Sequence, residues 1–173
     1  MLLKQENRAM AQTKFQGDTV NTHGDLPSEG SQAPEFTLTG SDLSDFSAAD
    51  YQGKKIVLNI FPSVDTGVCA QSVRTFNEKA ADLDNTVVIC ASEDLPFAHE
   101  RFCAAEGIEN VVSGSAFRSS FGEDFGVLQA DGPMKGLLAR AVIVLDAEGK
   151  VVYTQLVPEI TEEPDYEAAL AAI

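Results

Sequence analysis

Two short apolar runs, separated by a stretch of helical periodicity, constrain the fold of this chain more than any other feature. Residues 55–60 read KIVLNI and residues 86–92 read TVVICAS, and both are rich in β-branched side chains. Between them, apolar residues from Val68 to Leu83 recur at near-helical spacing. Strands joined through a helix lie parallel, and strands this apolar need cover on both faces. The sequence therefore predicts the centre of an α/β sheet.

Further elements are predicted on either side of this unit. They are a short hairpin with a connecting loop (11–35), an edge strand (35–39), a helix from Pro96 to Gly107, a shorter helical segment (115–126), a β-hairpin (140–146 with 151–156) and a last helix (163–173). The β-hairpin adds antiparallel strands to the parallel pair. We therefore expect an α/β sandwich with a mixed central β-sheet flanked by helices, whose functional groups lie at the carboxyl ends of the strands.

The charge of the chain argues against two classes of partner. With 12 basic and 27 acidic residues, the formal net charge is −15. Nucleic acids and anionic membrane surfaces both need a positive patch, so neither is an expected partner. No run approaches the ~20 apolar residues of a membrane span, and residues 1–10 lack the apolar core of a secretory signal. We expect a cytoplasmic protein with a single domain over residues 11–173, and we assign no role to residues 1–10.

Three cysteines, Cys69, Cys90 and Cys103, are the candidate reactive groups of this sequence. A small odd number does not suggest a structural disulfide framework, and the absence of C-x-x-C argues against a dithiol oxidoreductase. Cys90 ends an apolar run, so we expect it to be buried and inert. His99 and Cys103 are four apart on one predicted helix, but nothing completes a four-ligand metal site. We expect no metal, and we expect His99 to be a surface or capping side chain.

Cys69 stands where a strand ends and a helix begins, in the stretch FPSVDTGVC. The nucleophilic form of cysteine is the thiolate, and the unpaired N–H groups of a helix start favour an anion. Gly67 allows close approach of the backbone, and the Thr66 hydroxyl is within reach of the sulfur or of a substrate oxygen. Arg74 and Arg140 are candidate cationic partners. Local chemistry alone leaves open whether Cys69 is a nucleophile or a small core side chain.

The pattern Pro62-x-x-x-Thr66-x-x-Cys69 resembles the active-site signature of the peroxiredoxins. The longer string over residues 59–69 is similar to that of one subfamily, the thiol peroxidases called Tpx, which are atypical two-cysteine peroxiredoxins. Three more stretches are similar in the same order, namely DLPFA at 94–98 leading to RFC at 101–103, ADGP at 130–133 and EPDYEAAL at 163–170. The resemblance covers about residues 11–173.

This resemblance implies a thioredoxin-like fold with an N-terminal β-hairpin extension, and a role for each residue of the motif. Cys69 would be the peroxidatic cysteine, whose thiolate attacks a hydroperoxide and becomes a sulfenic acid. Thr66 would hydrogen-bond the thiolate and the peroxide. Arg140 would stabilise the thiolate and the developing negative charge, and Pro62 would shield the pocket and shape the loop. Arg74, one helical turn further on, remains open between a site residue and a surface arginine.

Cys103 would be the resolving cysteine of such an enzyme, forming an intramolecular disulfide with Cys69 that thioredoxin then reduces. Two cysteines in packed helices rarely have Cα atoms within the ~4.4–6.8 Å that a disulfide demands. We therefore predict that one or both helix ends unwind between the reduced and oxidised forms.

The resemblance also implies the substrates and partners of the chain. The substrates would be hydrogen peroxide and organic hydroperoxides, no metal, flavin or haem would be needed, and the chain would form a homodimer. Two alternatives remain, a non-enzymatic redox sensor that uses the same disulfide and an acidic binding module without redox chemistry.

Overall fold

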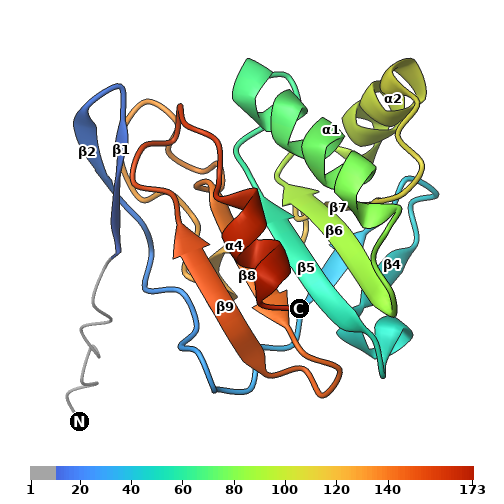
Figure 1. Cartoon of the computed structure of the whole chain (residues 1–173). Coiled ribbons are helices and arrows are strands. Elements are labelled where there is room, and N and C mark those ends of the chain that lie inside the picture. Colours follow the sequence, from blue (N-terminus) through green and yellow to red (C-terminus); the bar gives the residue numbers. More distant parts are fainter. Residues whose placement is uncertain (1–10) are drawn as a thin grey trace, which may run out of the picture.

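The fold is described here from a computed structural model that covers residues 11–173. The proposed N-terminal extension, residues 1–10, lies outside the described residues. Within the described part, the chain forms one two-stranded sheet, β1 with β2, and one seven-stranded sheet in the order β4-β3-β7-β6-β5-β8-β9. The seven-stranded sheet and its flanking helices make the mixed α/β architecture that the sequence predicts (Figure 1).

The elements have the following bounds. The strands are β1 (Gln12–Phe15), β2 (Asp18–Asn21), β3 (Thr37–Thr39), β4 (Asp45–Ser47), β5 (Lys55–Ile60), β6 (Thr86–Ser92), β7 (Val112–Ser115), β8 (Ala141–Leu145) and β9 (Val151–Leu156). The helices are the 3-10 helix η1 (Ala48–Tyr51) and the α-helices α1 (Gly67–Ala80), α2 (Pro96–Glu106), α3 (Phe121–Asp124) and α4 (Tyr166–Ala171).

The central strands pair as the apolar runs predict. β5 and β6 are parallel, with Ile60 opposite Ala91 at their carboxyl ends. β8 lies antiparallel on the other side of β5 and begins opposite the end of that strand, with Ala141 paired to Ile60. The end of β5 leads to α1, the end of β6 leads to α2, and the residue before β8 is Arg140. Three segments that carry predicted site residues therefore meet at one edge of the sheet.

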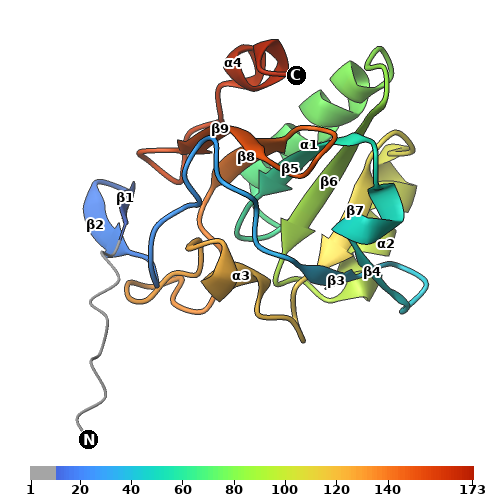
Figure 2. The ribbon, with the colours of Figure 1, turned by 90° about the horizontal axis from the view of Figure 1, so that it is seen from below.

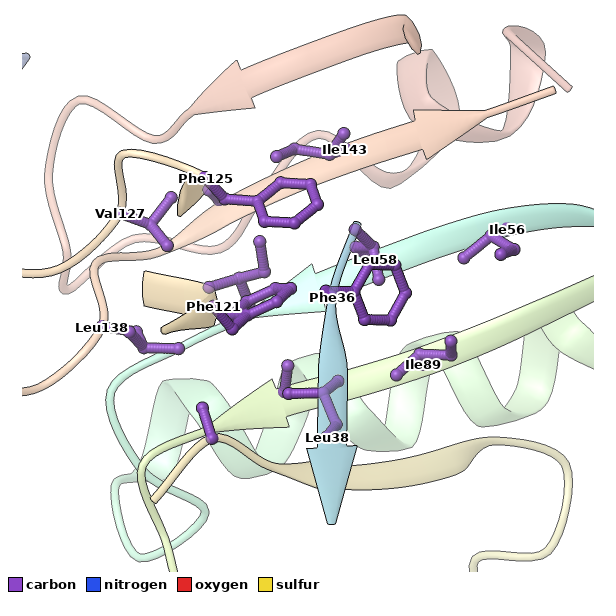
Figure 3. Close-up of a cluster of buried hydrophobic side chains, with 14 of the residues drawn as sticks. Phe36, Leu38, Ile56, Leu58, Ile89, Phe121, Phe125, Val127, Leu138 and Ile143 are labelled. Carbon is purple, nitrogen blue, oxygen red and sulfur yellow. The ribbon is translucent and has the colours of Figure 1, made fainter. Parts of the chain in front are cut away.

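Side chains of β5 alternate between two apolar layers, which is why the whole strand is apolar. Ile56 and Leu58 contribute to a cluster on one face, with Phe121 of α3 and the nearby Phe36 (Figure 3). Val57 contributes to the cluster on the opposite face, which also holds side chains of α1 and α4. Figure 2 shows α3 on the side of the sheet opposite to α4 and α1. The sheet is thus covered on both faces.

Helix α2 ends where the sequence predicts. Gly107 caps the helix in the left-handed conformation, with φ of 65°, and its N–H bonds to the carbonyl of Cys103. Glycine adopts this conformation without the steric cost of a Cβ atom, so it favours the end of the helix at this residue.

Three expectations about the elements are wrong in detail, and two short strands, β4 and β7, have no counterpart in the sequence prediction. The strand near 35–39 is not at the edge, because β4 pairs with its outer side. The strand β7 is not predicted, because its sequence VSGS has no alternation of apolar and polar residues. In the structure β7 pairs with β6, and Gly114 packs so closely against Leu38 that a Cβ atom at this position would stand 2.7 Å from the leucine Cδ1. The segment 115–126 is helical only over α3. The last helix begins at Tyr166 and not at residue 163, because Asp165 is its N-cap and accepts a hydrogen bond from the Ala168 N–H.

The two-stranded hairpin of β1 and β2 confirms the expected N-terminal hairpin. In residues 11–173, none of the helices combines the length and the apolar character needed to cross a membrane.

Candidate active site

Cys69 lies in the first turn of α1 and is completely buried. Thr66 is the N-cap of the helix in an extended conformation, and its hydroxyl donates to the Ser63 carbonyl at 3.0 Å. The bend before the helix contains Pro62, which is also buried. In this structure the Thr66 hydroxyl therefore stabilises the loop that precedes the helix. Within residues 11–173, the Thr66 hydroxyl makes no hydrogen bond to the Cys69 sulfur, although the family resemblance implies one.

Arg140, the residue before β8, brings a positive charge to the Cys69 sulfur. Its guanidinium Nη2 lies 3.2 Å from the Cys69 Sγ, and its Nε donates to the Ile160 carbonyl at 2.8 Å. The side chain is only 2% exposed. Among the described residues, its Nη1 has no hydrogen-bond partner. Within residues 11–173, the guanidinium thus has one donor on the sulfur and a second donor, Nη1, that remains unpaired.

Cys103 lies on α2, half-buried, with its sulfur 3.3 Å from the Ser113 hydroxyl of β7. Its sulfur thus has a partner on the sheet, whereas the Cys69 sulfur has Arg140. All three cysteines of the described chain are free thiols. The structure therefore corresponds to the reduced form.

Arg74 is engaged elsewhere and does not contact Cys69. Its Nε and Nη2 donate to the two carboxylate oxygens of Glu106 at 2.9 and 3.0 Å, and its guanidinium lies 5.9 Å from the ring centre of Phe102. The pairing with Arg74 lowers the pKa of the Glu106 carboxyl. Of the two readings that the sequence left open, the structure favours a surface role, in which Arg74 joins α1 to α2.

The expectation that His99 is a surface or capping side chain is wrong. His99 is 2% exposed, its Nε2 lies 2.9 Å from the Ser92 hydroxyl, and its ring packs edge-on to Phe61. Burial lowers the pKa of the imidazole. Where the chain is described, the structure contains no cluster of three or more His, Cys, Asp or Glu side chains that could hold a metal ion.

Asp94 is the polar residue of this region to which the sequence assigned no role. Its carboxylate accepts hydrogen bonds from Ser63 and Val64 of the loop before α1 and from Ser92 at the end of β6. Asp94 belongs to the stretch DLPFA, which carries part of the family resemblance, and this is the feature of the sequence that could have identified it as a functional residue. Its partners could not be deduced because they are brought together only by the pairing of β5 with β6.

Cys90 is buried in β6, as expected. Burial raises the pKa of its thiol to about 12, and the Asn59 side-chain amide at 3.6 Å only partly opposes this. A thiol of this kind is almost fully protonated near neutral pH and reacts poorly.

Alkylation is expected to distinguish Cys90 from Cys103. At pH 8 a thiol with a pKa near 12 is ionised in about one molecule in 10⁴. Iodoacetamide should therefore modify Cys103 in the native protein while Cys90 remains unmodified, and the Cys90 thiolate should increase only as the pH rises toward 12. Peptide mapping by mass spectrometry after timed quenching measures both rates. In guanidinium chloride both cysteines should react, and equal native rates would show that Cys90 is not protected.

Comparison with known proteins assigns the chain to a family. A family model described as Redoxin matches residues 28–170. The thiol peroxidase of Mycobacterium tuberculosis is 62% identical over 164 residues, which span 95% of this chain and 99% of that protein. The thiol peroxidase of Corynebacterium glutamicum is 63% identical over the same length and with the same coverage.

Solved structures agree with this assignment. A peroxiredoxin-like protein from Aquifex aeolicus superposes with a TM-score of 0.89 at 41% identity, over 94% of this chain and 96% of that one. A thiol peroxidase from Chromobacterium violaceum, at 21% identity and a TM-score of 0.82 over 92% of this chain and 93% of that one, supports the fold alone. The expected thioredoxin-like fold class is thereby confirmed. The chain belongs to the Redoxin family, as a member of the thiol peroxidase subfamily of the peroxiredoxins.

Proposed function

We propose that this enzyme reduces hydrogen peroxide and organic hydroperoxides to water and alcohols through Cys69. The observation that carries the proposal is the 3.2 Å contact between the buried Arg140 guanidinium and the Cys69 sulfur at the start of α1. A fixed positive charge and a helix N-terminus both stabilise a thiolate. The thiolate attacks the terminal peroxide oxygen, the O–O bond breaks, and the alkoxide or hydroxide leaves with a proton as alcohol or water. Cys69 becomes a sulfenic acid.

Arg140 is suited to interact with both the Cys69 sulfur and the peroxide in this step. While Nη2 remains on the sulfur, Nη1 of the same group is available to donate to the peroxide oxygens. Donors that are already in place where negative charge develops lower the barrier without reorganisation. Pro62 would shape the loop that covers the sulfur, and the Thr66 hydroxyl would turn from the Ser63 carbonyl toward the peroxide.

The second half of the cycle would use Cys103. Its thiolate attacks the Cys69 sulfenic sulfur, the S–O bond breaks, water leaves and a disulfide forms. Cys69 and Cys103 lie on different helices and are free thiols in this structure, and we expect this step to require local unwinding around one or both helices. The thiols of reduced thioredoxin would then reopen the disulfide, leaving thioredoxin oxidised.

The organisation of the chain is part of the proposal. Residues 11–173 would form a single domain that works in the cytoplasm as a homodimer. Leu95 and Phe97, near the start of α2, are 50% and 61% exposed, which supports burial of an apolar surface next to the active site in a dimer.

A coupled assay tests the function directly. With thioredoxin, thioredoxin reductase and NADPH, addition of hydrogen peroxide or an alkyl hydroperoxide should produce continuous NADPH oxidation that depends on this protein. A redox sensor would form the disulfide once per chain and turn over slowly. An acidic binding module would consume no peroxide. Either of these two outcomes would overturn the proposed peroxidase cycle.

A further inference from the structure

The carboxylate of Asp94 is the centre of a hydrogen-bond network beside the site. One oxygen accepts from the Ser63 hydroxyl at 2.7 Å, and the other accepts from the Val64 N–H at 2.9 Å and from the Ser92 hydroxyl at 2.6 Å. An ionised carboxylate that accepts several hydrogen bonds holds its donors strongly, because charge-assisted hydrogen bonds are about twice as strong as neutral ones.

The loop that the network holds is the one that carries Pro62 and Thr66. Ser63 and Val64 lie between these two residues, and the Ser63 carbonyl is the acceptor of the Thr66 hydroxyl. The position of both predicted site residues in the reduced protein therefore depends on the two contacts that Asp94 makes with this loop.

The same network reaches α2, which carries Cys103. Asp94 lies two residues before Pro96, the first residue of α2, and its own backbone carbonyl accepts a hydrogen bond from the Ser115 hydroxyl at the end of β7. Ser92 gives its one hydroxyl proton to Asp94 and lies 2.9 Å from the His99 Nε2, so the imidazole is the donor in that contact. The network runs from the loop before α1 through Asp94 and Ser92 to His99, the fourth residue of α2.

We propose that Asp94 is a positioning residue that holds the loop before α1 and the start of α2 together in the peroxide-reactive form. The proposal rests on the proposed function, because it concerns the two steps of that cycle. Oxidation of Cys69 needs the loop in place, whereas attack by Cys103 needs the loop and α2 to separate. Asp94 would thus speed the first step and slow the second.

The change Asp94→Asn keeps the shape of the side chain but replaces one acceptor oxygen by an N–H donor. The change removes the negative charge that strengthens all three hydrogen bonds, and an amide N–H can no longer accept from the donor that it faces. We expect oxidation of Cys69 to slow by about tenfold or more and disulfide formation to become at least about threefold faster. Rapid mixing with hydrogen peroxide, acid quenching, alkylation and intact-mass measurement yield both rates.

Asp146→Asn is the matched control. Asp146 accepts the Glu148 and Lys150 N–H groups at 2.9 Å each in the turn between β8 and β9, so its loss weakens a turn of similar chemistry outside the network. It should lower the melting temperature without changing either rate. Ser63→Ala removes one donor to Asp94, together with the acceptor of the Asp65 N–H, and should shift both rates in the same directions as Asp94→Asn, by less. This variant tests the proposal if Asp94→Asn does not fold.

The decisive result is that the two rates change in opposite directions in Asp94→Asn while both stay unchanged in Asp146→Asn, since general loosening of the fold would change the rates in both variants. Unchanged rates, or two rates that both fall, in Asp94→Asn and Ser63→Ala overturn the role of Asp94. Failure of the wild-type protein to oxidise Cys69 at all would instead overturn the proposed function.

Discussion

Replacing Cys69 with serine is expected to abolish peroxide consumption, with a loss of at least about 10³-fold, as for removal of other enzymatic nucleophiles. A serine hydroxyl is not ionised near neutral pH and cannot replace the thiolate, even beside the Arg140 guanidinium. The coupled NADPH assay and direct peroxide measurement should both fall to the level without enzyme. Because Cys69 is buried in the first turn of α1, a circular dichroism spectrum must show that the variant is folded.

Cys90→Ala is the matched control for this experiment. Cys90 is also completely buried, and the burial that raises the pKa of its thiol to about 12 makes it a poor nucleophile. This variant should keep wild-type peroxidase activity even if its melting temperature falls. Full activity in Cys69→Ser, or loss of activity in Cys90→Ala with the fold intact, would show that the nucleophile has been assigned to the wrong cysteine.

Replacing Cys103 with serine is expected to stop turnover while leaving the first chemical step intact. Serine can keep the contact with the Ser113 hydroxyl, so the fold around α2 should be retained. Without a second thiol, the Cys69 sulfenic acid has no intramolecular partner for a disulfide. One equivalent of peroxide should therefore be consumed per chain in forming the sulfenic acid, and thioredoxin-linked NADPH oxidation should fall to background.

Mass spectrometry checks each part of this expectation. After one equivalent of peroxide, dimedone should label Cys69 in the Cys103→Ser protein, whereas the wild-type protein should show a peptide linked between Cys69 and Cys103. With excess peroxide, the variant should accumulate sulfinic acid at Cys69 because resolution no longer competes with further oxidation. Sustained turnover in the variant, or a link from Cys69 to Cys90 in the wild type, would contradict the role of Cys103.

The central layers of the fold were predictable because they depend on periodicity within short segments. β5 and β6 are apolar on both faces, and the spacing of apolar residues in α1 is visible without any partner. β4 and β7 were missed because each is three or four residues long and polar, so that pairing within the sheet, not local preference, makes them strands.

The site was predictable only in part, for the same physical reason. The place of Cys69 at a helix start follows from local sequence, but its contact with Arg140 joins residues 71 apart in the chain. The sequence named Arg140 as a candidate, and its assignment to the sulfur came from the family resemblance. The buried position of His99 and the partners of Asp94 depend on how β6 and α2 pack together. Hydrogen bonds of this kind produce no periodic pattern in the sequence from which they could be predicted.

The buried guanidinium of Arg140 has a further consequence for how the proposed cycle would advance. It takes part in none of the ion pairs found in residues 11–173, so a Cys69 thiolate would be its only neutralising charge. Conversion of the thiolate to a neutral sulfenic acid would leave a cation without a counter-charge in the protein interior, which is strongly unfavourable. The oxidation event would thereby act as an electrostatic trigger, because the loss of one negative charge would favour hydration of Arg140 and hence the opening that we propose for the attack by Cys103.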